Sequence, residues 1–349
     1  MIFSTAVWRR VVTVSAATLA MSVGSIAQAV TLNGAGASFP KPLYDRYFSE
    51  IQTQTGLQVN YEAIGSGGGI RQFIAGTTDF GGTDAPPSEE EIAQMEDGLI
   101  LIPTAGGAVA VVYNLPGIEN LNLSRDVLPK IFSGEISRWN DPALAAANPG
   151  VSLPDKPIRV SVRADGSGTT FIFTRHLAAL SGDFVATKSP DEWPSAANVQ
   201  GGRGNSGVAA LVQQNEGAVG YVQASYAAEN NMQYALLENA SGEFVAPIPV
   251  ANADRALENM EFSTANNRFI PQGLEDPSEG YPIVGVTWLM LKENYEDAEK
   301  AEAIQTIVQW ILNDGQDING ELQYTRIPGS VAQAAISAVT NGINATASR

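Results

Sequence analysis

The chain has 349 residues, of which 44% are hydrophobic and 16% are charged, and its formal net charge is −17. This length and composition suit about two globular domains with a sizeable core, and so acidic a surface excludes nucleic acid as a partner. The sequence contains no cysteine, which excludes disulfides, thiol catalysis and anchoring through a lipid-modified cysteine.

Residues 1–29 have the pattern of a secretory signal peptide. Arg9 and Arg10 precede the apolar run Val11–Val23, and Ala27-Gln28-Ala29 forms an A-x-A cleavage site. A transmembrane anchor is the alternative, but the apolar run is too short to span a bilayer. We therefore predict an exported, soluble protein that is cleaved after Ala29.

The chain that follows alternates between strand-like and helix-like segments. Leu43, Tyr47 and Ile51 recur every four residues, which predicts an amphipathic helix ending near Gly56. Strands are predicted at Val30–Leu32, Leu57–Ile64, Phe80–Asp84, Ile100–Pro103, Gly107–Tyr113, Ile158–Arg163, Val219–Val222 and Ile283–Leu291. Further helices are predicted at Ser88–Gln94, Leu128–Ile131, Trp139–Ala147, Gly207–Gln214, Glu296–Leu312 and Ser330–Thr340. We expect surface loops at Asp191–Asn205 and Asn266–Pro282. This alternation indicates an α/β fold in two lobes, with ligands bound beyond the carboxyl ends of strands.

Three glycine-rich segments each lead into a predicted helix: GAGASFP (Gly34–Pro40), IGSGGGI (Ile64–Ile70) and RADGSGTTF (Arg163–Phe171). A helix start leaves its first N–H groups unpaired and carries partial positive charge, so it favours anions. Four hydroxyls lie beside these glycines: Ser38, Ser66, Ser167 and Thr169. Each alone suits an ordinary N-cap. Together with the N–H groups of Phe39 and Gly168, they suit the oxygens of one tetrahedral anion.

Two charged residues refine this hypothesis. Arg163 either forms a surface salt bridge with Asp165 or, oriented by Asp165, forks onto two oxygens of the anion. Asp84 ends a predicted strand and is either a turn residue, a helix N-cap or a hydrogen-bond acceptor for the anion. A carboxylate among anion donors makes sense only for a ligand that carries a proton. Phosphate keeps a proton near neutral pH and sulfate does not, so Asp84 favours phosphate over sulfate.

Catalytic and metal-binding signals are weak. His176 is the single histidine, is predicted to lie in a helix with partial exposure, and has no evident nucleophile beside it. The sequence has no EF-hand, H-E-x-x-H or P-loop motif. We expect neither a metal nor another cofactor.

The chain resembles the PstS family, the periplasmic phosphate-binding proteins of high-affinity phosphate ABC transporters. The resemblance covers nearly all of the chain after Ala29 and rests on six motifs in the family's order. These are GAGASFP (Gly34–Pro40), GSGGGI (Gly65–Ile70), TDFGGTDAP (Thr78–Pro86), IFSGEISRWND (Ile131–Asp141), RADGSGTTF (Arg163–Phe171) and NEGAVGYV (Asn215–Val222). Ser38 stands where many members have threonine, and Gly67 stands where a second serine is common.

The resemblance implies a two-lobe periplasmic binding protein fold of type II, with two chain crossings and the ligand in the interlobe cleft. Lobe I would comprise residues 30–114 and 262–349, and lobe II residues 115–261. The implied function is capture of inorganic phosphate for the membrane permease subunits of an ABC importer, by a monomer in the periplasm that is not an enzyme. The implied phosphate contacts are Ser38, Phe39, Ser66, Asp84, Arg163, Ser167, Gly168 and Thr169, with Asp165 as the partner of the arginine.

Other functions remain open from the residues alone. A receptor for another oxyanion is one, although Asp84 argues against sulfate and molybdate; arsenate is protonated like phosphate. A phosphoesterase with Ser38 or Ser167 as its nucleophile is another, although a second histidine and a metal motif are absent from the sequence. A surface protein that has lost its ligand is a third.

Overall fold

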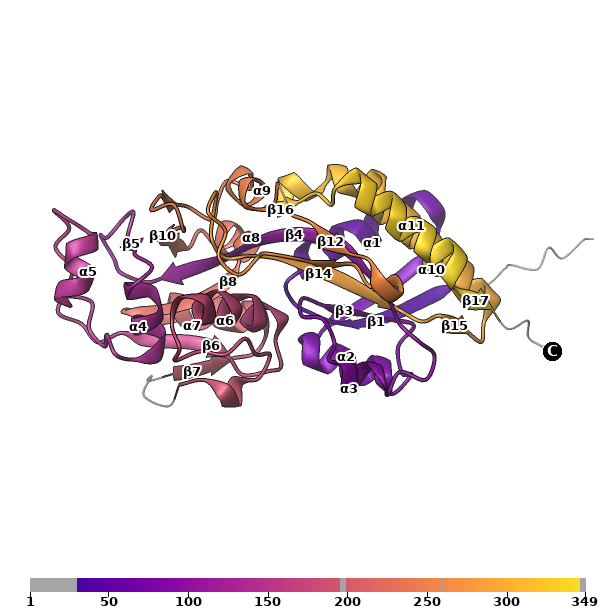
Figure 1. The fold of residues 1–349 in the computed structure, drawn as a ribbon, viewed down its shortest axis with the longest axis horizontal. Helices are drawn as coiled ribbons and strands as arrows, with labels where there is room; N and C mark the ends of the chain where they lie inside the picture. The colour runs from indigo at the N-terminus through magenta and orange to yellow at the C-terminus, as the bar shows by residue number, and fades with distance from the viewer. Residues whose placement is uncertain (1–29, 195–198, 259, 346–349) are drawn as a thin grey trace, which may run out of the picture.

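A long mixed sheet runs through the elongated molecule and joins two α/β halves (Figure 1). The computed structural model describes residues 30–194, 199–258 and 260–345, so the predicted signal peptide at residues 1–29 lies outside the described residues. Across the sheet the strand order is β2 (Gln58–Ala63), β1 (Thr31–Gly36), β3 (Phe80–Thr83), β14 (Val284–Leu291), β4 (Ile100–Tyr113), β8 (Ala218–Gln223), β6 (Arg159–Arg163) and β7 (Val199–Gly202).

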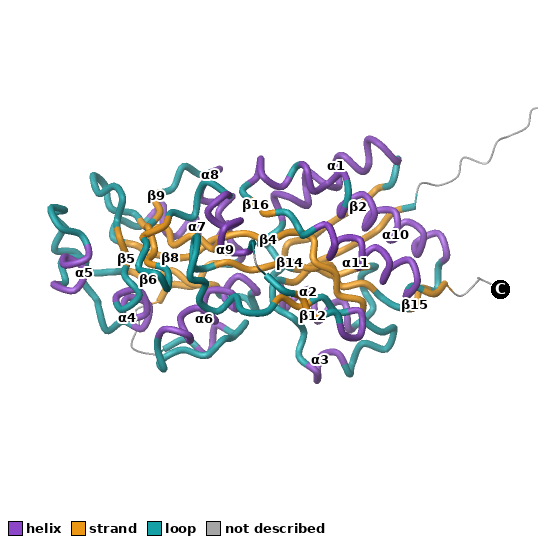
Figure 2. The backbone as a smooth tube through the Cα atoms, turned by 45° about the horizontal axis from the view of Figure 1, so that its top comes forward, coloured by secondary structure: helices purple, strands orange, loops and turns teal. Residues whose placement is uncertain are grey.

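Helices flank this sheet in both halves, and α10 and α11 pack together at the end near the C-terminus (Figure 2). The helices are α1 (Lys41–Thr55), α2 (Ser66–Ile74), α3 (Glu89–Ile92), α4 (Val127–Ser133), α5 (Pro142–Ala147), α6 (Gly168–Leu180), α7 (Gly204–Gln214), α8 (Ala224–Glu229), α9 (Ala251–Leu257), α10 (Ala298–Leu312) and α11 (Gly329–Gly342). Short strands complete the fold: β5 (Asn122–Leu123), β9 (Gln233–Tyr234), β10 (Leu236–Glu238), β11 (Phe244–Val245), β12 (Phe262–Ser263), β13 (Ile270–Pro271), β15 (Asn294–Tyr295), β16 (Tyr324–Thr325) and β17 (Asn344–Ala345).

The predicted amphipathic helix is confirmed as α1. Leu43, Tyr47 and Ile51 are fully buried on one face of it, as spacing by four residues requires. Pro42 occupies its first turn, where a missing N–H costs nothing, and Gly56 ends it with φ of +79°. No helix within residues 30–194, 199–258 and 260–345 has both the length and the apolarity needed to cross a membrane.

The strands of the two halves point their carboxyl ends at each other. Phe80 of β3 and Ile100 of β4 both pair with Leu291, and each strand is antiparallel to β14, so β3 and β4 run in the same direction. Strand β1 is parallel to both β2 and β3. In the other half, β8 is antiparallel to β4 and parallel to β6, which is parallel to β7. The loops that follow the two sets of strands therefore meet in the middle of the molecule.

The separate strands predicted at Ile100–Pro103 and Gly107–Tyr113 are wrong, because β4 is one continuous strand. Its 14 residues are all buried and extend for roughly 46 Å. Pro103 lacks an N–H and suggests a break in the sequence. In the structure the register against β14 shifts between Thr287 and Trp288, so that one residue of β4 has no partner there. This bulge accommodates the proline within the strand.

Three other expectations also need correction. Asp191–Asn205 is not only a surface loop, because it contains β7 and ends with the fully buried Asn205 in α7. Trp139 precedes α5 instead of belonging to it, and it donates a hydrogen bond of 2.9 Å to the carbonyl oxygen of Gly217. His176 is 1% exposed, not partly exposed, because it lies on the face of α6 that packs against the Glu275 loop.

Candidate ligand-binding site

The residues predicted to bind an anion lie together where the two halves meet. Each of the three glycine-rich loops follows a strand and begins or precedes a helix: β1 leads to α1, β2 to α2, and β6 to α6. Asp84 directly follows β3. The side chains are sealed from solvent, with none more than 4% exposed: Ser38, Phe39, Ser66, Asp84, Arg163, Ser167 and Thr169.

Ser66 joins the two halves through its hydroxyl. Its Oγ accepts hydrogen bonds from the backbone N–H of Gly168, at 3.0 Å, and of Asp84, at 3.2 Å. Nearby, the N–H of Gly67 donates to the carbonyl oxygen of Gly166 at 2.9 Å. A Cβ on Gly168 would lie 2.6 Å from both the Cβ of Asp84 and the Oγ of Ser66, so only glycine permits this approach. The backbones of the two halves are thus in direct contact at this point.

Arg163 is held rigidly by Asp165. Its Nε and Nη2 donate to the two carboxylate oxygens at 2.9 Å and 2.5 Å, and its Nη1 lies 3.5 Å from the Oγ1 of Thr169. The Arg163 side chain is 1% exposed, so the alternative of a surface salt bridge is wrong. Asp165 is itself fixed by the N–H of Gly204 at 3.1 Å. This fork leaves Nη1 directed at the cluster of hydroxyls.

An aromatic cluster contacts the backbone of Arg163 through the Tyr221 hydroxyl. The Tyr221 hydroxyl accepts the backbone N–H of Arg163 at 3.3 Å and shares a hydrogen bond of 2.7 Å with Thr170. The Tyr221 ring stacks on Phe173 with centroids 4.3 Å apart, and Trp193 stacks on both. Burial raises the pKa of Tyr221 to about 12, so its hydroxyl stays neutral. The backbone of Arg163 is therefore hydrogen-bonded to one member of a stacked aromatic cluster.

Asn205 belongs to this cluster although the sequence analysis placed it in a loop. Its amide nitrogen donates to the Oγ of Ser38 at 3.0 Å and to the Oγ1 of Thr169 at 3.1 Å, and its backbone N–H also donates to Ser38. Its Oδ1 accepts the N–H of Gln223 at 2.8 Å. A sequence signal existed: Gly201–Gly207 (GGRGNSG) is a further glycine-rich segment that runs into a helix.

Asp84 is the one acid at the centre of the cluster. It is 1% exposed, and its Oδ1 accepts a hydrogen bond of 2.8 Å from the Thr287 hydroxyl. Its Oδ2 is buried without a partner among the described residues. Burial raises the pKa of Asp84 to about 7, against the lowering effects of the Thr287 hydrogen bond, the Arg163 charge and Ser66. Thr287 was also missed, although it is the polar residue of an apolar strand, VGVTWLML.

The N-cap alternative holds for one of the four hydroxyls. The Oγ of Ser167 accepts the N–H of Thr170 at 3.0 Å and caps α6. Ser38 lies before the N-cap of α1, Ser66 is the first residue of α2, and Thr169 lies within α6. Those three hydroxyls therefore have no capping role. Phe39 is fully buried, and its carbonyl oxygen accepts the Tyr324 hydroxyl at 2.6 Å.

The cluster offers little for catalysis or metal binding. His176 directs its Nδ1 to the carbonyl oxygen of Glu275 at 2.9 Å, in the contact between α6 and the 275 loop. In the part of the chain that the structure describes, no three histidine or acidic side chains come together as a metal site would need. What the arrangement can do is donate hydrogen bonds to a small anion from hydroxyls, an arginine and helix starts, and accept one hydrogen bond at Asp84.

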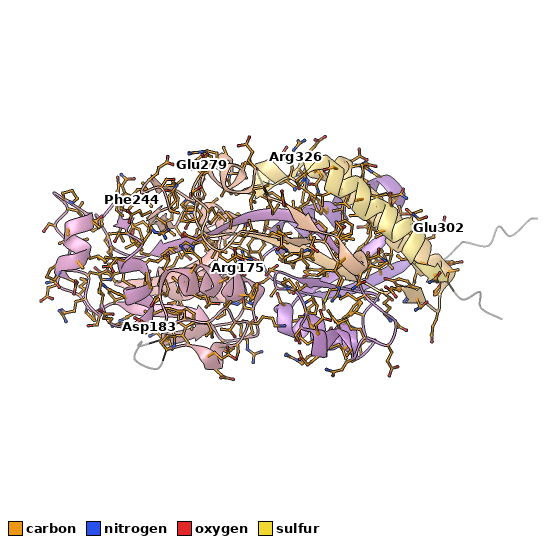
Figure 3. The ribbon with its side chains drawn as sticks, viewed as in Figure 1. Arg175, Asp183, Phe244, Glu279, Glu302 and Arg326 are labelled. Atoms are coloured by element: carbon orange, nitrogen blue, oxygen red, sulfur yellow. The ribbon has the colours of Figure 1, made fainter. Side chains whose placement is uncertain are left out.

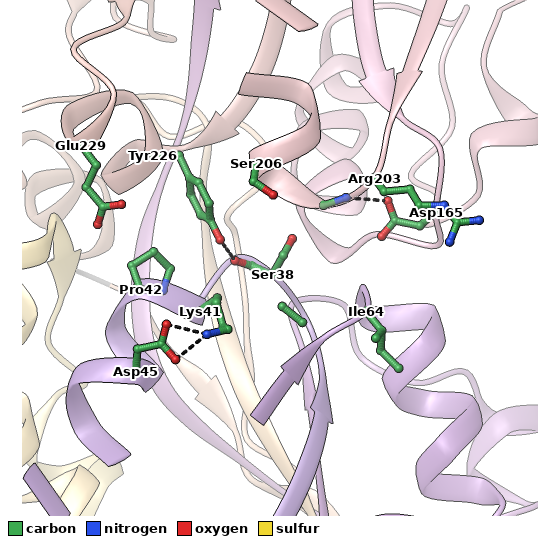
Figure 4. Close-up of a pocket in the computed structure, with 12 residues that line it drawn as sticks. Ser38, Lys41, Pro42, Asp45, Ile64, Asp165, Arg203, Ser206, Tyr226 and Glu229 are labelled. Atoms are coloured by element: carbon green, nitrogen blue, oxygen red, sulfur yellow. Dashed lines mark hydrogen bonds and ion pairs between the residues drawn. The ribbon is translucent and has the colours of Figure 1, made fainter. Parts of the chain in front are cut away.

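A cavity of about 660 Å³ opens beside this cluster, between the halves (Figure 4). Ser38 and Asp165 are among its lining residues, so the cavity borders the buried cluster. The Tyr226 hydroxyl reaches across it from the second half and donates to the carbonyl oxygen of Ser38 at 2.6 Å (Figure 4). On α6, the partly buried Arg175, which is labelled in Figure 3, donates a hydrogen bond of 3.0 Å to the carbonyl oxygen of Val284.

Comparisons with known proteins agree with this architecture. Residues 22–314 match the model of the PBP superfamily domain. The phosphate-binding protein PstS of Pasteurella multocida is 39% identical over 311 residues, which cover 88% of this chain and 89% of that protein. PstS of Xylella fastidiosa is 38% identical, covering 88% of this chain and 84% of that protein.

Among solved structures, a high-affinity periplasmic phosphate-binding protein, PfluDING, with bound phosphate superimposes with a TM-score of 0.75. It is 21% identical, and the match covers 91% of this chain and all of that one. The predicted fold is confirmed: this is an α/β protein with the two-lobe architecture of periplasmic binding proteins. Within that class, the chain belongs to the PstS family of phosphate-binding proteins.

Proposed function

We propose that this protein captures inorganic phosphate and delivers it to the permease of an ABC importer. The observation that carries the proposal is Asp84, whose Oδ2 is buried and unpartnered in a cluster made otherwise of donors. An anion with no proton would leave that oxygen unpaired and would meet like charge there. A phosphate that keeps one proton would donate it to Oδ2, and its other oxygens would accept from the surrounding groups.

The roles proposed for the individual residues follow from their positions. Arg163, held by Asp165, would provide charge-assisted hydrogen bonds through Nη1. Neutral donors would surround the remaining oxygens: the hydroxyls of Ser38, Ser66, Ser167 and Thr169 and the backbone N–H groups of Phe39 and Gly168. Asn205 joins this set as a positioning residue, because it already holds two of the hydroxyls.

The lobe boundaries are part of the proposal. We infer that lobe I comprises residues 30–114 and 262–349 and lobe II residues 115–261. The end of β4 at Tyr113 and the start of β12 at Phe262 support these boundaries. Ser66 and Gly168 would then belong to different lobes, so phosphate would be enclosed by closure of one lobe onto the other.

We also propose that the protein works in the periplasm, without its signal peptide, as a monomer that performs no chemistry and needs no metal. The names of its relatives describe binding proteins. A serine nucleophile has no support in the cluster, since Ser38 accepts from Asn205 and Ser167 caps a helix. The one histidine lies against Glu275, away from both serines' hydrogen-bond partners.

The test is calorimetric titration of the purified chain, freed of carried-over ligand, with phosphate and then with sulfate. We expect one-to-one phosphate binding and no heat from sulfate. Asp84→Asn should keep phosphate binding and admit sulfate, because an amide no longer repels it. Asp314→Asn, an exposed change, is the matched control. Absence of phosphate heat in the wild-type chain would refute the function, and exclusion of sulfate by Asp84→Asn would refute the role of Asp84.

A further inference from the structure

The cavity beside the buried cluster is walled by both halves of the molecule. Ser38, Lys41 and Asp45 line it from the first half, and Asp165, Arg203 and Glu229 line it from the second. We call this cavity the vestibule. The vestibule lies between the halves, and its lining residues Ser38 and Asp165 also contact the buried cluster.

Arg203 is a cation of the vestibule that has no partner among the described residues. Lys41 is paired with Asp45 at 2.5 Å, and Asp165 is occupied by Arg163. Arg203 is exposed and, within the described residues, forms neither an ion pair nor a side-chain hydrogen bond. Most cations of the described chain are paired, as Arg125, Lys188 and Arg268 illustrate. The chain has a net charge of −17, which repels anions. An unpaired cation beside a buried anion site counters this repulsion locally and attracts an approaching anion.

Position in the fold ties Arg203 to the buried residues. It is the N-cap of α7, and the two residues that follow bind the cluster directly. The N–H of Gly204 donates to Asp165, and Asn205 donates to Ser38 and Thr169. Arg203 is thus adjacent in the chain to two residues that hold the cluster together.

The opposite end of the vestibule is acidic. Glu229 faces the cavity from α8, and Asp45 faces it from α1; Figure 4 shows both away from Arg203. Partial burial, and to a lesser extent the charge of Asp45, raise the pKa of Glu229. Lys41 neutralises Asp45, so the unpaired charges of the vestibule are Arg203 on one side, which attracts an anion, and Glu229 on the other, which repels it.

We propose that the vestibule is the access route for phosphate and that Arg203 is the cation that draws the anion in. This inference rests on the proposed function. Arg203 acts on the rate of association and makes no contact with phosphate in the closed site, so its removal slows capture without speeding release. Glu229 acts in the opposite sense, because it repels the approaching anion.

The experiment measures both rate constants for Arg203→Gln, Glu229→Gln and Arg159→Gln. Arg159 is the matched control, since it is exposed, lies at the far end of β6 from Arg163, and forms no ion pair within the described residues. Dissociation is followed by chasing bound radiolabelled phosphate with unlabelled phosphate, and the dissociation constant by equilibrium dialysis. Their ratio gives the association rate constant, measured at low salt and at about 0.5 M salt, where the Debye length is only a few ångströms.

At low salt we expect Arg203→Gln to lower the association rate constant about threefold and Glu229→Gln to raise it about twofold, with both effects lost at high salt. Dissociation should not change. The inference is overturned if Arg203→Gln lowers the association rate constant no more than Arg159→Gln does. It is also overturned if Glu229→Gln has a lower association rate constant than wild type. If wild type binds no phosphate, the proposed function itself fails, which the dialysis arm shows separately.

Discussion

The Thr287 hydroxyl donates a 2.8 Å hydrogen bond to Oδ1 of Asp84. Thr287 lies in β14, which pairs with β3, and Asp84 directly follows β3, so β14 holds the acid in place. Thr287 lies at the register shift between β14 and β4, where the bulge re-aims side chains. This hydrogen bond to one carboxylate oxygen partly offsets the rise that burial causes in the pKa of Asp84, and it leaves the other oxygen available to the ligand.

We first predict that Thr287→Val weakens phosphate binding. The valine keeps the shape of the side chain but removes the hydroxyl, so the buried carboxylate loses a charge-assisted hydrogen bond worth about 2 kcal/mol, or roughly thirtyfold in affinity. Titration calorimetry at pH 8 measures the loss. Thr287→Ser restores the donor and should bind within about threefold of wild type. Equal losses in both variants would mean that packing, not the hydrogen bond, matters.

Asp84 should also give the ligand-free protein a characteristic pH dependence. Its pKa in the folded chain is raised to about 7 from 3.8, so the folded state prefers the protonated acid. That stabilisation is complete below the unfolded pKa and is lost as the pH rises through about 7. We expect Asp84→Asn to be more stable than wild type by a few kcal/mol at pH 8, with a smaller gap at pH 5. Urea unfolding of phosphate-free protein, with Asp314→Asn as control, tests this; a gap that does not vary with pH would contradict it.

Gly168→Ala should prevent full closure. Its Cβ would lie 2.6 Å from atoms of both Asp84 and Ser66, and separation of the halves is the simplest relief. Overpacking of this kind costs about 1–3 kcal/mol, so phosphate affinity should fall roughly tenfold to a hundredfold. Gly182→Ala adds the same methyl group where nothing lies within 4 Å and should leave binding unchanged. The dissociation constants of both variants, from equilibrium dialysis, decide the matter.

Lys188 should slow the release of phosphate. Its Nζ lies 2.7 Å from a carboxylate oxygen of Glu91 across the two halves, and its carbonyl oxygen accepts the N–H of Ser167. Because both side chains are partly exposed, the pair is worth at most about 1 kcal/mol, and Lys188→Gln should speed dissociation about twofold to fivefold at low salt. Lys130→Gln breaks the pair with Asp126 within one helix and serves as the control. Equal dissociation rates in the two variants would show that the ion pair between Lys188 and Glu91 does not slow phosphate release.

Local patterns predicted much of the fold and of the site. The spacing of apolar residues in α1 and the composition of the glycine-rich loops reflect constraints that act within a few residues. For this reason Ser38, Ser66 and Arg163 could be predicted as site residues from the sequence. The contacts between them could not, since the bond between Ser66 and Gly168 joins residues 102 positions apart. Such pairings depend on strand order and direction, which no local pattern encodes.

The errors have physical causes as well. The strand predicted at Ile100–Pro103 ended at the proline, whereas a bulge in the long-range pairing with β14 accommodates Pro103 within one continuous strand. The polar run around Asn205 resembled a solvated loop, and yet its amide is buried because two hydroxyls and a backbone N–H pair with it. His176 was expected at the surface, and the carbonyl oxygen of Glu275, 99 residues away, satisfies it in the interior.

The unbroken strand β4 makes the two halves inseparable as folding units. Its first residues pair with β14 beside β3, and its last residues pair with β8. Cutting the chain near Asn114 would therefore leave a fragment with an orphaned sheet edge on each side, exposed to aggregation. A biosensor or chimera built from this protein should exchange loops at its surface and leave both halves on one polypeptide.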